Sequence, residues 1–318
     1  MAVTQSSKSE PGAQPPGTPP MPDVPGVEVD HEYYDLPSVR MHVARVGDRS
    51  LPAILLVHGW PEHWWMWRGV LGELAKEAHL IVPDLRGHGW SSVPTGRHAA
   101  DKGALAEDLA HLLDAMSIDD IAIAGHDWGA YASQLLALEH PEKVRRLLVF
   151  SISSVIPAPL PPIKALWPLK YQIGLAWPFS DKIIARSAGT MIAKAKRADV
   201  RQRQQYAPED SAVYGRQQAD PARAKFTQTM YRSFLLGDLR RLAGKYKGSR
   251  FTVPVRFVFA EHDGFVSVRF GDHLTRQGEQ VEVVTQNLTG HFVVDEDPTY
   301  VAGQIREWIL PAAVPLAG

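Results

Sequence analysis

The sequence predicts an α/β fold: a mostly parallel, doubly wound sheet that carries an inserted helical segment. Two observations predict it. Short apolar runs, typical of buried parallel strands, recur along the chain and alternate with stretches whose apolar residues have helical spacing, as over 105–116. Between Phe150 and Val255 this alternation stops, and about a hundred residues follow without a convincing buried strand.

Composition limits the class of protein. A chain of 318 residues fits one large domain, or one domain with an insertion, and a hydrophobic content of 45% is enough for a core. The net charge of −1 gives no electrostatic case for a nucleic-acid or membrane partner. The chain has no cysteine, which removes disulfides and thiol catalysis and fits a reducing cytosol. No apolar run approaches the ~20 residues of a membrane span.

The first elements are a tail and a hairpin. Residues 1–25 are rich in Pro, Gly, Ser and Gln and have no apolar segment of the secretory kind, which predicts a disordered tail. A Pro-rich docking motif is the alternative. Residues 27–34 and 39–46 then predict two half-exposed strands, paired as a hairpin at a sheet edge.

Buried strands and the insertion come next. The predicted buried strands are 53–57, 80–82, 121–124, 147–150, 255–259 and 281–284. The predicted core therefore comprises 26–152 and 245–318. The insertion, 153–244, contains helical stretches and is expected to form a cap over the carboxyl ends of the strands, where ligands bind in open α/β sheets.

The most informative motif is Gly125-His126-Asp127-Trp128-Gly129, between a predicted buried strand and a predicted helix. A Gly-x-nucleophile-x-Gly pentapeptide at such a joint is typical of a nucleophile elbow, in which the central side chain stands exposed above the sheet. Here the central residue is Asp127 in place of the usual serine. The alternative is an ordinary turn residue with an Asx cap.

An elbow nucleophile predicts an acid and then a histidine further along the chain. Asp263 follows one predicted strand, with Glu261 as a competing acid, and His291 follows the last strand. The backbone N–H groups of Trp128 and Trp60 are the candidates for an oxyanion hole. Pro61 fixes the turn after Trp60, and the bond between them could be cis.

Residues 28–310 resemble the α/β-hydrolase superfamily and, within it, the epoxide hydrolase branch. The resemblance rests on His58-Gly59-Trp60-Pro61, on Asp84-Leu85-Arg86-Gly87-His88-Gly89-Trp90-Ser91, on Gly125 to Ala130, on Asp263 and on Gly290-His291-Phe292. It implies the α/β-hydrolase fold and an aspartate nucleophile. Haloalkane and haloacid dehalogenases use the same aspartate elbow, so a dehalogenase is the alternative activity.

The resemblance also implies two cap tyrosines whose hydroxyls lie over the nucleophile and contact the substrate. Met230-Tyr231-Arg232 and Lys170-Tyr171-Gln172 resemble the two elements. Tyr206 and Tyr214 compete with Tyr171, and either chosen tyrosine could instead be a core aromatic. Trp60 and Trp128 are expected to line the substrate site. A dehalogenase would use tryptophans as cap donors, and the candidates are Trp167 and Trp177.

An aspartate nucleophile selects the chemistry. A carboxylate is ionised at neutral pH without a base, and attack on a saturated carbon gives a stable alkyl ester. An epoxide oxygen leaves as an alkoxide and needs proton donors, which Tyr171 and Tyr231 supply. His291, oriented by Asp263, then activates the water that hydrolyses the ester. We therefore expect a small apolar epoxide and water as partners, and a vicinal diol as product.

The other polar residues are expected to be structural. His58 and His126 should bond loop carbonyls, and Trp64, Trp65 and Trp67 should pack against the first helix of the core. The basic run 194–203 predicts a solvated helix face, with a basic groove as the alternative. No spacing of ligand residues predicts a metal, and no cofactor is expected. We expect a cytoplasmic monomer or homodimer.

Overall fold

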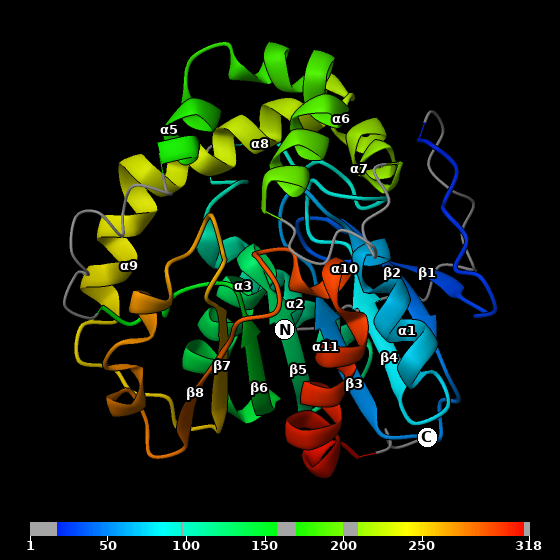
Figure 1. Ribbon diagram of the computed structural model, residues 1–318, viewed down its shortest axis with the longest axis vertical. Helices are drawn as coiled ribbons and strands as arrows, with labels where there is room; N and C mark the ends of the chain where they lie inside the picture. Colours follow the sequence, from blue (N-terminus) through cyan, green and yellow to red (C-terminus); the bar gives the residue numbers. More distant parts are fainter. Residues whose placement is uncertain (1–17, 97, 158–169, 200–208, 315–318) are drawn as a thin grey trace, which may run out of the picture.

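A computed structural model describes residues 18–96, 98–157, 170–199 and 209–314. Its centre is a single eight-stranded sheet (Figure 1). The strands are β1 (Asp30–Asp35), β2 (Arg40–Val46), β3 (Ala53–Val57), β4 (His79–Pro83), β5 (Ile121–His126), β6 (Val144–Phe150), β7 (Val255–Ala260) and β8 (Val281–Gln286).

The spatial order of the strands is β1-β2-β4-β3-β5-β6-β7-β8. Strand β2 is antiparallel to both β1 and β4, and the remaining neighbours are parallel. Strands β3, β4 and β5 are buried along their whole length, as expected for parallel strands covered on both faces. The predicted fold class, with its edge hairpin, is confirmed.

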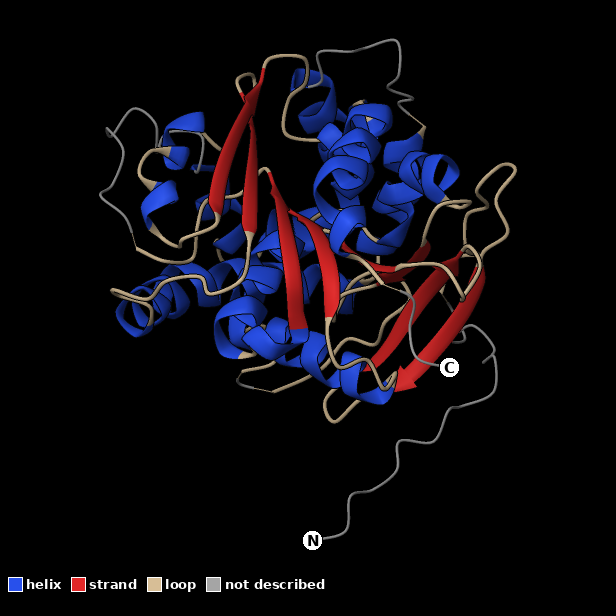
Figure 2. Cartoon of the chain, turned by 90° about the horizontal axis from the view of Figure 1, so that it is seen from below, coloured by secondary structure: helices blue, strands red, loops and turns tan. Residues whose placement is uncertain are grey.

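Helices cover both faces of the sheet (Figure 2). The helices that pack on the sheet are α1 (Arg68–Leu74), α2 (Lys102–Ala115), α3 (Asp127–Glu139), α10 (Val293–Glu296) and α11 (Pro298–Gln304). Helices α1 and α11 lie side by side on one face, and α2 and α3 lie together on the other (Figure 1). This arrangement leaves the carboxyl ends of the parallel strands as the open edge of the core.

A second group of helices lies over that edge (Figure 1). The described ones are α5 (Lys170–Ala176), α6 (Ser180–Asp199), α7 (Asp210–Gln218), α8 (Pro221–Ser233) and α9 (Leu239–Lys245). We call them the cap helices. Local sequence explains where α8 begins: the Asp220 side chain accepts the N–H of Ala222 at 2.8 Å, and Pro221 occupies the first turn.

The prediction of a disordered tail through residue 25 is wrong for its last residues. The indole N–H of Trp90 donates to the carbonyl of Pro19 at 2.9 Å, and the indole N–H of Trp65 donates to that of Asp23 at 3.0 Å. Val24, which follows Asp23, is also buried. Two buried tryptophans therefore tie 18–25 to the core. Residues 1–17 lie outside the described ranges.

The prediction of a solvated face for the basic run 194–203 is wrong at Lys196. This side chain is 1% exposed and forms ion pairs with Glu62 and Asp295. Two buried carboxylates on the core compensate its charge, which sequence spacing does not reveal. Residues 200–203 of the run lie outside the described ranges.

Within the described ranges of the chain, every helix is too short or too polar to cross a membrane.

Candidate active site

Asp127 lies at the sharp joint between β5 and α3, where its φ of +49° is in the left-handed region. Two close backbone approaches shape this turn. A Cβ at position 129 would lie 2.2 Å from the carbonyl oxygen of His58, and one at position 125 would lie 2.7 Å from the Cα of Ala130. Only glycine fits at either position, so the pentapeptide forms a tight elbow with Asp127 at its tip.

Two backbone N–H groups point at the Asp127 carboxylate. The N–H of Trp60 donates to Oδ1 at 3.0 Å, and the backbone N–H of Trp128 also bonds the carboxylate. The Trp60–Pro61 peptide is cis. A Cβ on Gly59 would lie 2.4 Å from the Cβ of Asp127, so glycine at this position allows the loop to approach the elbow. The same two donors can stabilise negative charge that develops on Oδ1.

His291 lies on the other side of Asp127. Its Nε2 is 3.7 Å from Asp127 Oδ2, and its Nδ1 is 2.9 Å from Asp263 Oδ2. The second oxygen of Asp263 accepts the backbone N–H groups of Phe265 and Val266, each at 2.7 Å. Asp263 is therefore held in place and orients the imidazole, whereas Glu261 is exposed. The three residues predicted as nucleophile, acid and base come together.

The charges of this group shift two pKa values. Burial lowers the pKa of His291, but the carboxylates of Asp263, Asp127 and Asp199 outweigh it and raise that pKa to about 9. Burial raises the pKa of Asp127, while His291 and the two backbone N–H groups act in the opposite direction. The balance raises the pKa of Asp127, and the higher pKa of His291 favours the imidazolium form in the resting site.

Both predicted cap tyrosines face the elbow. Tyr231, on α8, is buried, and its hydroxyl accepts the indole N–H of Trp128 at 3.1 Å. Tyr171, on α5, meets Tyr231 edge to face with ring centroids 6.0 Å apart. Burial, then nearby charges that include Asp127, raise the pKa of both hydroxyls, so both are protonated at neutral pH.

The competing tyrosines occupy other positions. Tyr214, on α7, is fully buried, and its hydroxyl donates to Asp295 at 3.4 Å, away from the elbow. Tyr206 lies outside the described residues. The same holds for Trp167, one of the two tryptophans considered as cap donors, whereas Trp177 is 65% exposed.

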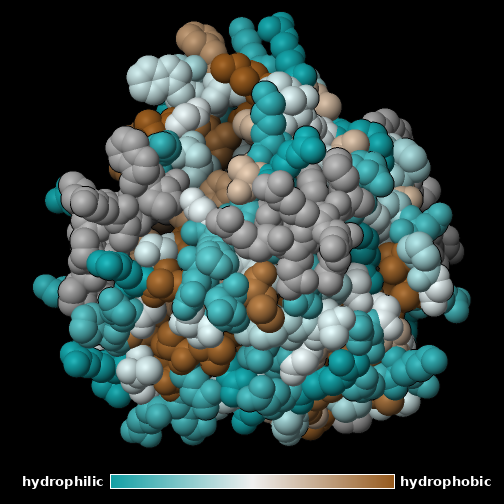
Figure 3. All heavy atoms as spheres, in the orientation of Figure 1, coloured by the Kyte–Doolittle hydropathy of each residue, from teal (hydrophilic) through white to brown (hydrophobic). Residues whose placement is uncertain are grey.

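A cavity of about 250 Å³ opens beside these residues. Trp60, Tyr171 and His291 line it, and of the described residues that line it only the latter two titrate. The remaining lining is largely apolar: Pro61, Gly174, Leu175, Ser180, Ile183, Ile184, Met191, Ile192, Ala195, Phe265 and Phe292. Ile183 is also exposed at the surface. On the face in Figure 3 hydrophobic atoms form small separate groups, one of them at the top of the cap.

Three buried charges near the site went unrecognised in the sequence. Lys102, on α2, places its ammonium 4.2 Å from the ring centroid of Trp128 and donates to the carbonyl of Met230 at 3.1 Å. Lys196 reaches Glu62, which directly follows the oxyanion loop. Asp199, at the end of α6, accepts the backbone N–H of His291. Position in a motif could have marked Glu62, the partner of Lys196, but nothing local marks the three charges themselves.

The two flanking histidines are structural, as expected. His58 Nδ1 lies 2.9 Å from the carbonyl oxygen of Gly59, and its Nε2 accepts the backbone N–H of Leu85 at 2.9 Å. His126 Nε2 lies 2.8 Å from the carbonyl oxygen of His291. Both rings therefore brace loops of the site.

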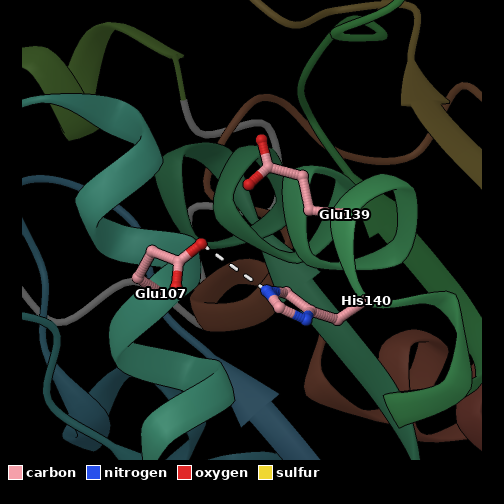
Figure 4. Close-up of side chains that lie close together, drawn as sticks. All are labelled: Glu107, Glu139 and His140. Atoms are coloured by element: carbon pink, nitrogen blue, oxygen red, sulfur yellow. Dashed lines mark ion pairs between the residues drawn. The ribbon is translucent and has the colours of Figure 1, made fainter.

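One group of side chains within the described ranges has the spacing of a metal site: Glu107, Glu139 and His140 (Figure 4). It lies on α2 and at the end of α3, outside the site. Glu139 already binds the ammonium of Lys245 at 2.5 Å and the hydroxyl of Tyr246. We therefore interpret Glu107, Glu139 and His140 as part of a surface ion-pair network.

Comparison with known proteins identifies the family of the chain. The sequence pattern of the family described as alpha/beta hydrolase fold matches residues 52–298. "Epoxide hydrolase 4" of mouse is 34% identical over 113 residues, which are 36% of this chain and 32% of that protein. "Soluble epoxide hydrolase" of a Corynebacterium strain is 36% identical over 126 residues, 39% of this chain and 42% of that protein.

These alignments span between about a third and two fifths of the curated relatives' lengths. A solved structure titled "Epoxide hydrolase CorEH without ligand" superimposes with a TM-score of 0.79 at 26% identity, over 89% of this chain and 99% of that one. The match to the sequence pattern covers most of the chain. The chain therefore belongs to the alpha/beta hydrolase fold family.

Proposed function

We propose that the protein is an epoxide hydrolase that opens an epoxide to a vicinal diol through an ester on Asp127. One observation carries the proposal: Asp127 at the elbow lies close enough to two cap tyrosines for its charge to raise the pKa of both hydroxyls. A carboxylate can displace an epoxide oxygen from a saturated carbon, and the tyrosines supply the proton that the departing oxygen needs. Similarity to epoxide hydrolases supports the same activity.

In the first step Asp127 Oδ2 attacks an epoxide carbon and the carbon–oxygen bond of the ring breaks. The ring oxygen takes a proton from Tyr231 or Tyr171. The indole N–H of Trp128, which already donates to the Tyr231 oxygen at 3.1 Å, stabilises the phenolate that remains. The enzyme then carries a β-hydroxyalkyl ester on Asp127.

Before the second step the His291 imidazolium returns its proton to the tyrosine phenolate. The neutral imidazole then removes a proton from water, and the hydroxide attacks Cγ of Asp127. Negative charge develops on Oδ1, where the N–H groups of Trp60 and Trp128 receive it. The bond from Cγ to Oδ2 breaks, the departing oxygen takes the proton of the hydroxyl added at Cγ, and the diol leaves with Oδ2. The carboxylate is restored with an oxygen from water.

Esterification prepares the base for this second step. In the resting site the carboxylate of Asp127 helps to raise the pKa of His291 to about 9. The ester has no charge, so this contribution disappears when the first step is complete. The pKa of His291 then falls, so the imidazolium loses its proton more readily. The neutral imidazole can act as a base.

The cavity supports an apolar epoxide as substrate. Its walls between α5, α6 and the loop at Phe265 are almost entirely hydrocarbon and aromatic, which favours an uncharged aryl or alkyl group. A strong preference for small polar epoxides would contradict this part of the proposal.

A dehalogenase is the alternative, since it would use the same first step. A halide needs free donors near the attacked carbon. The two nearest indole N–H groups are already engaged: that of Trp128 with Tyr231, and that of Trp60 with Thr227 at 3.2 Å. This arrangement supports epoxide opening over halide release.

A paired turnover assay tests the proposal. Purified wild type, Asp127→Ala and the exposed control Asp48→Ala are given styrene oxide and stilbene oxide with diol as readout, and bromo- and chloroalkanes with free halide as readout. We expect diol from the wild type and the control, and none from Asp127→Ala. Halide release without diol would reassign the protein to the dehalogenases.

A further inference from the structure

The last turn of the cap helix α6 reaches into the catalytic loops of the core. Asp199 is the last described residue of this helix and is 4% exposed. One turn earlier, Lys196 forms buried ion pairs with Glu62 beside the oxyanion loop and with Asp295 beyond His291. The end of α6 is thus anchored to the core by charge on both sides of the site.

Asp199 uses both of its carboxylate oxygens on backbone groups of these loops. Oδ1 accepts the N–H of Gly264 at 2.7 Å, and Oδ2 accepts the N–H of His291. Gly264 directly follows Asp263. One cap side chain therefore holds both the loop of the acid and the loop of the base.

The loops leave room for this carboxylate. A Cβ on Gly264 would lie 2.8 Å from Asp199 Oδ1, and a Cβ on Gly290 would lie 2.3 Å from Oδ2. The residue before His291 and the residue after Asp263 are therefore both glycines with a carboxylate seated against them. The two N–H donors bond different oxygens of Asp199, so both oxygens of a carboxylate are used here, whereas an amide would place an NH₂ group at one of the two positions.

We infer that Asp199 is a positioning residue that sets the geometry between Asp263 and His291 from the cap. This inference rests on the proposed two-step function. Asp127 is held separately, by the elbow and by the N–H groups of Trp60 and Trp128. Asp199 therefore matters for ester hydrolysis, which needs His291, and not for ester formation.

The test measures the two steps separately in Asp199→Asn. The amide offers one acceptor oxygen and turns an N–H toward the second backbone donor, which displaces one of the two loops. We expect ester formation within about threefold of wild type and ester hydrolysis slowed at least about tenfold, since small misplacements cost up to about 100-fold. Rapid quench of the full chain with styrene oxide and intact-mass detection should show the alkylated enzyme accumulating.

Asp210→Asn is the matched control, because Asp210 also ties the cap to the core, through Arg68, without touching the loops of His291 or Asp263. It should not accumulate ester. Equal accumulation in both variants, or a parallel loss of both steps in Asp199→Asn, would assign Asp199 a merely structural role. A wild type that forms no diol and no ester refutes the proposed function instead.

Two further measurements apply if Asp199→Asn does not fold. Asp199→Glu keeps both acceptor oxygens and should slow hydrolysis less than the amide variant does. In the wild type, the amide hydrogens of Gly264 and His291 should exchange as slowly as those in the middle of α6. Fast exchange at both amides would overturn the inference.

Discussion

Asp127 and His291 lie 3.7 Å apart, yet different parts of the molecule hold them. Asp127 is fixed within the core: the close approaches at Gly129 and Gly59 leave no room for another turn. His291 and its partner Asp263 lie on longer loops after β8 and β7, and a side chain from the cap bonds both. The nucleophile is thus built into the sheet, while the acid–base pair depends on a second layer.

This difference in structural support corresponds to the two steps of the proposed reaction. In the proposed mechanism, ester formation draws on the elbow and on the tyrosines of α5 and α8. Ester hydrolysis draws on His291, whose loop is bonded to α6. Changes on the nucleophile side should therefore affect bond formation or folding, and changes on the acid–base side should trap the intermediate.

The largest expected effect separates the two sides completely. His291→Gln removes the base and leaves the elbow intact, so steady-state diol formation should fall at least about 1,000-fold. Intact-mass analysis after mixing with styrene oxide should show one equivalent of stable ester. A variant that turns over without accumulating ester would show that His291 is not the base of the second step.

Isotope labelling checks the same intermediate in the wild type. One turnover in ¹⁸O-labelled water should place the label in the peptide that contains Asp127, because Oδ2 leaves with the diol. Label that appears only in the first diol formed would mean direct attack of water on the epoxide.

Tyr231→Phe should come next in size. Loss of a general acid costs about 100- to 10,000-fold, and the retained Tyr171 should keep the effect near the lower end. Rapid-quench measurement should assign the loss to ester formation and show no accumulated ester. Tyr34→Phe, on the distant edge strand β1, serves as control. Loss confined to the hydrolysis step would place Tyr231 on the wrong half of the reaction.

Gly129→Ala tests how rigidly the core holds the elbow. The added methyl would meet the carbonyl oxygen of His58 at 2.2 Å, and overpacking of this kind costs typically about 1–3 kcal/mol. Denaturant unfolding should show this loss relative to Gly303→Ala, whose added methyl meets nothing within 4 Å. Equal stability of the two variants would mean that the elbow yields easily.

The pKa of His291 should differ between the resting enzyme and the esterified enzyme, an effect smaller than those of the substitutions above. In the resting state its pKa is raised from 6.5 to about 9, so the stability it contributes is present below about pH 6.5 and lost as pH rises toward 9. Imidazole NMR should report the resting value. The pH profile of ester hydrolysis should give a lower one, because esterified Asp127 has no charge. Identical values would contradict the proposed coupling.

The smallest effect is expected at the surface group of Glu107, Glu139 and His140 (Figure 4). Surface ion pairs contribute about 0–1 kcal/mol, so Glu107→Gln should leave activity and stability within error. EDTA should not change turnover. A loss on chelation, restored by one divalent metal, would show that the group binds a functional ion.

Sequence patterns predicted the fold class. They also predicted that Asp127, Asp263 and His291 lie at the carboxyl ends of strands, now seen to be β5, β7 and β8, because each residue lies in a short local motif. The hydrogen bonds of Asp199 have no local sequence motif. They join Asp199 to residues 65 and 92 positions away, and they require glycine at 264 and 290, where a side chain would collide with the carboxylate. Lys196 looked like a surface cation because only tertiary structure brings two carboxylates to it. Residues 18–25 looked disordered because their anchors are distant tryptophans.

Strands β6 and β7 are parallel neighbours in register, with Phe150 beside Val258, although a hundred residues separate their ends in sequence. The chain therefore enters the cap from β6 and re-enters the sheet at the adjacent strand β7. Replacing the cap need not change the order or pairing of the strands. For enzyme engineers this makes the segment a natural module for recombination. A transplanted cap, however, must bring its own carboxylate to the glycines at 264 and 290. In the proposed mechanism, a chimera chosen only for pocket shape would accumulate the ester on Asp127 and stop turning over.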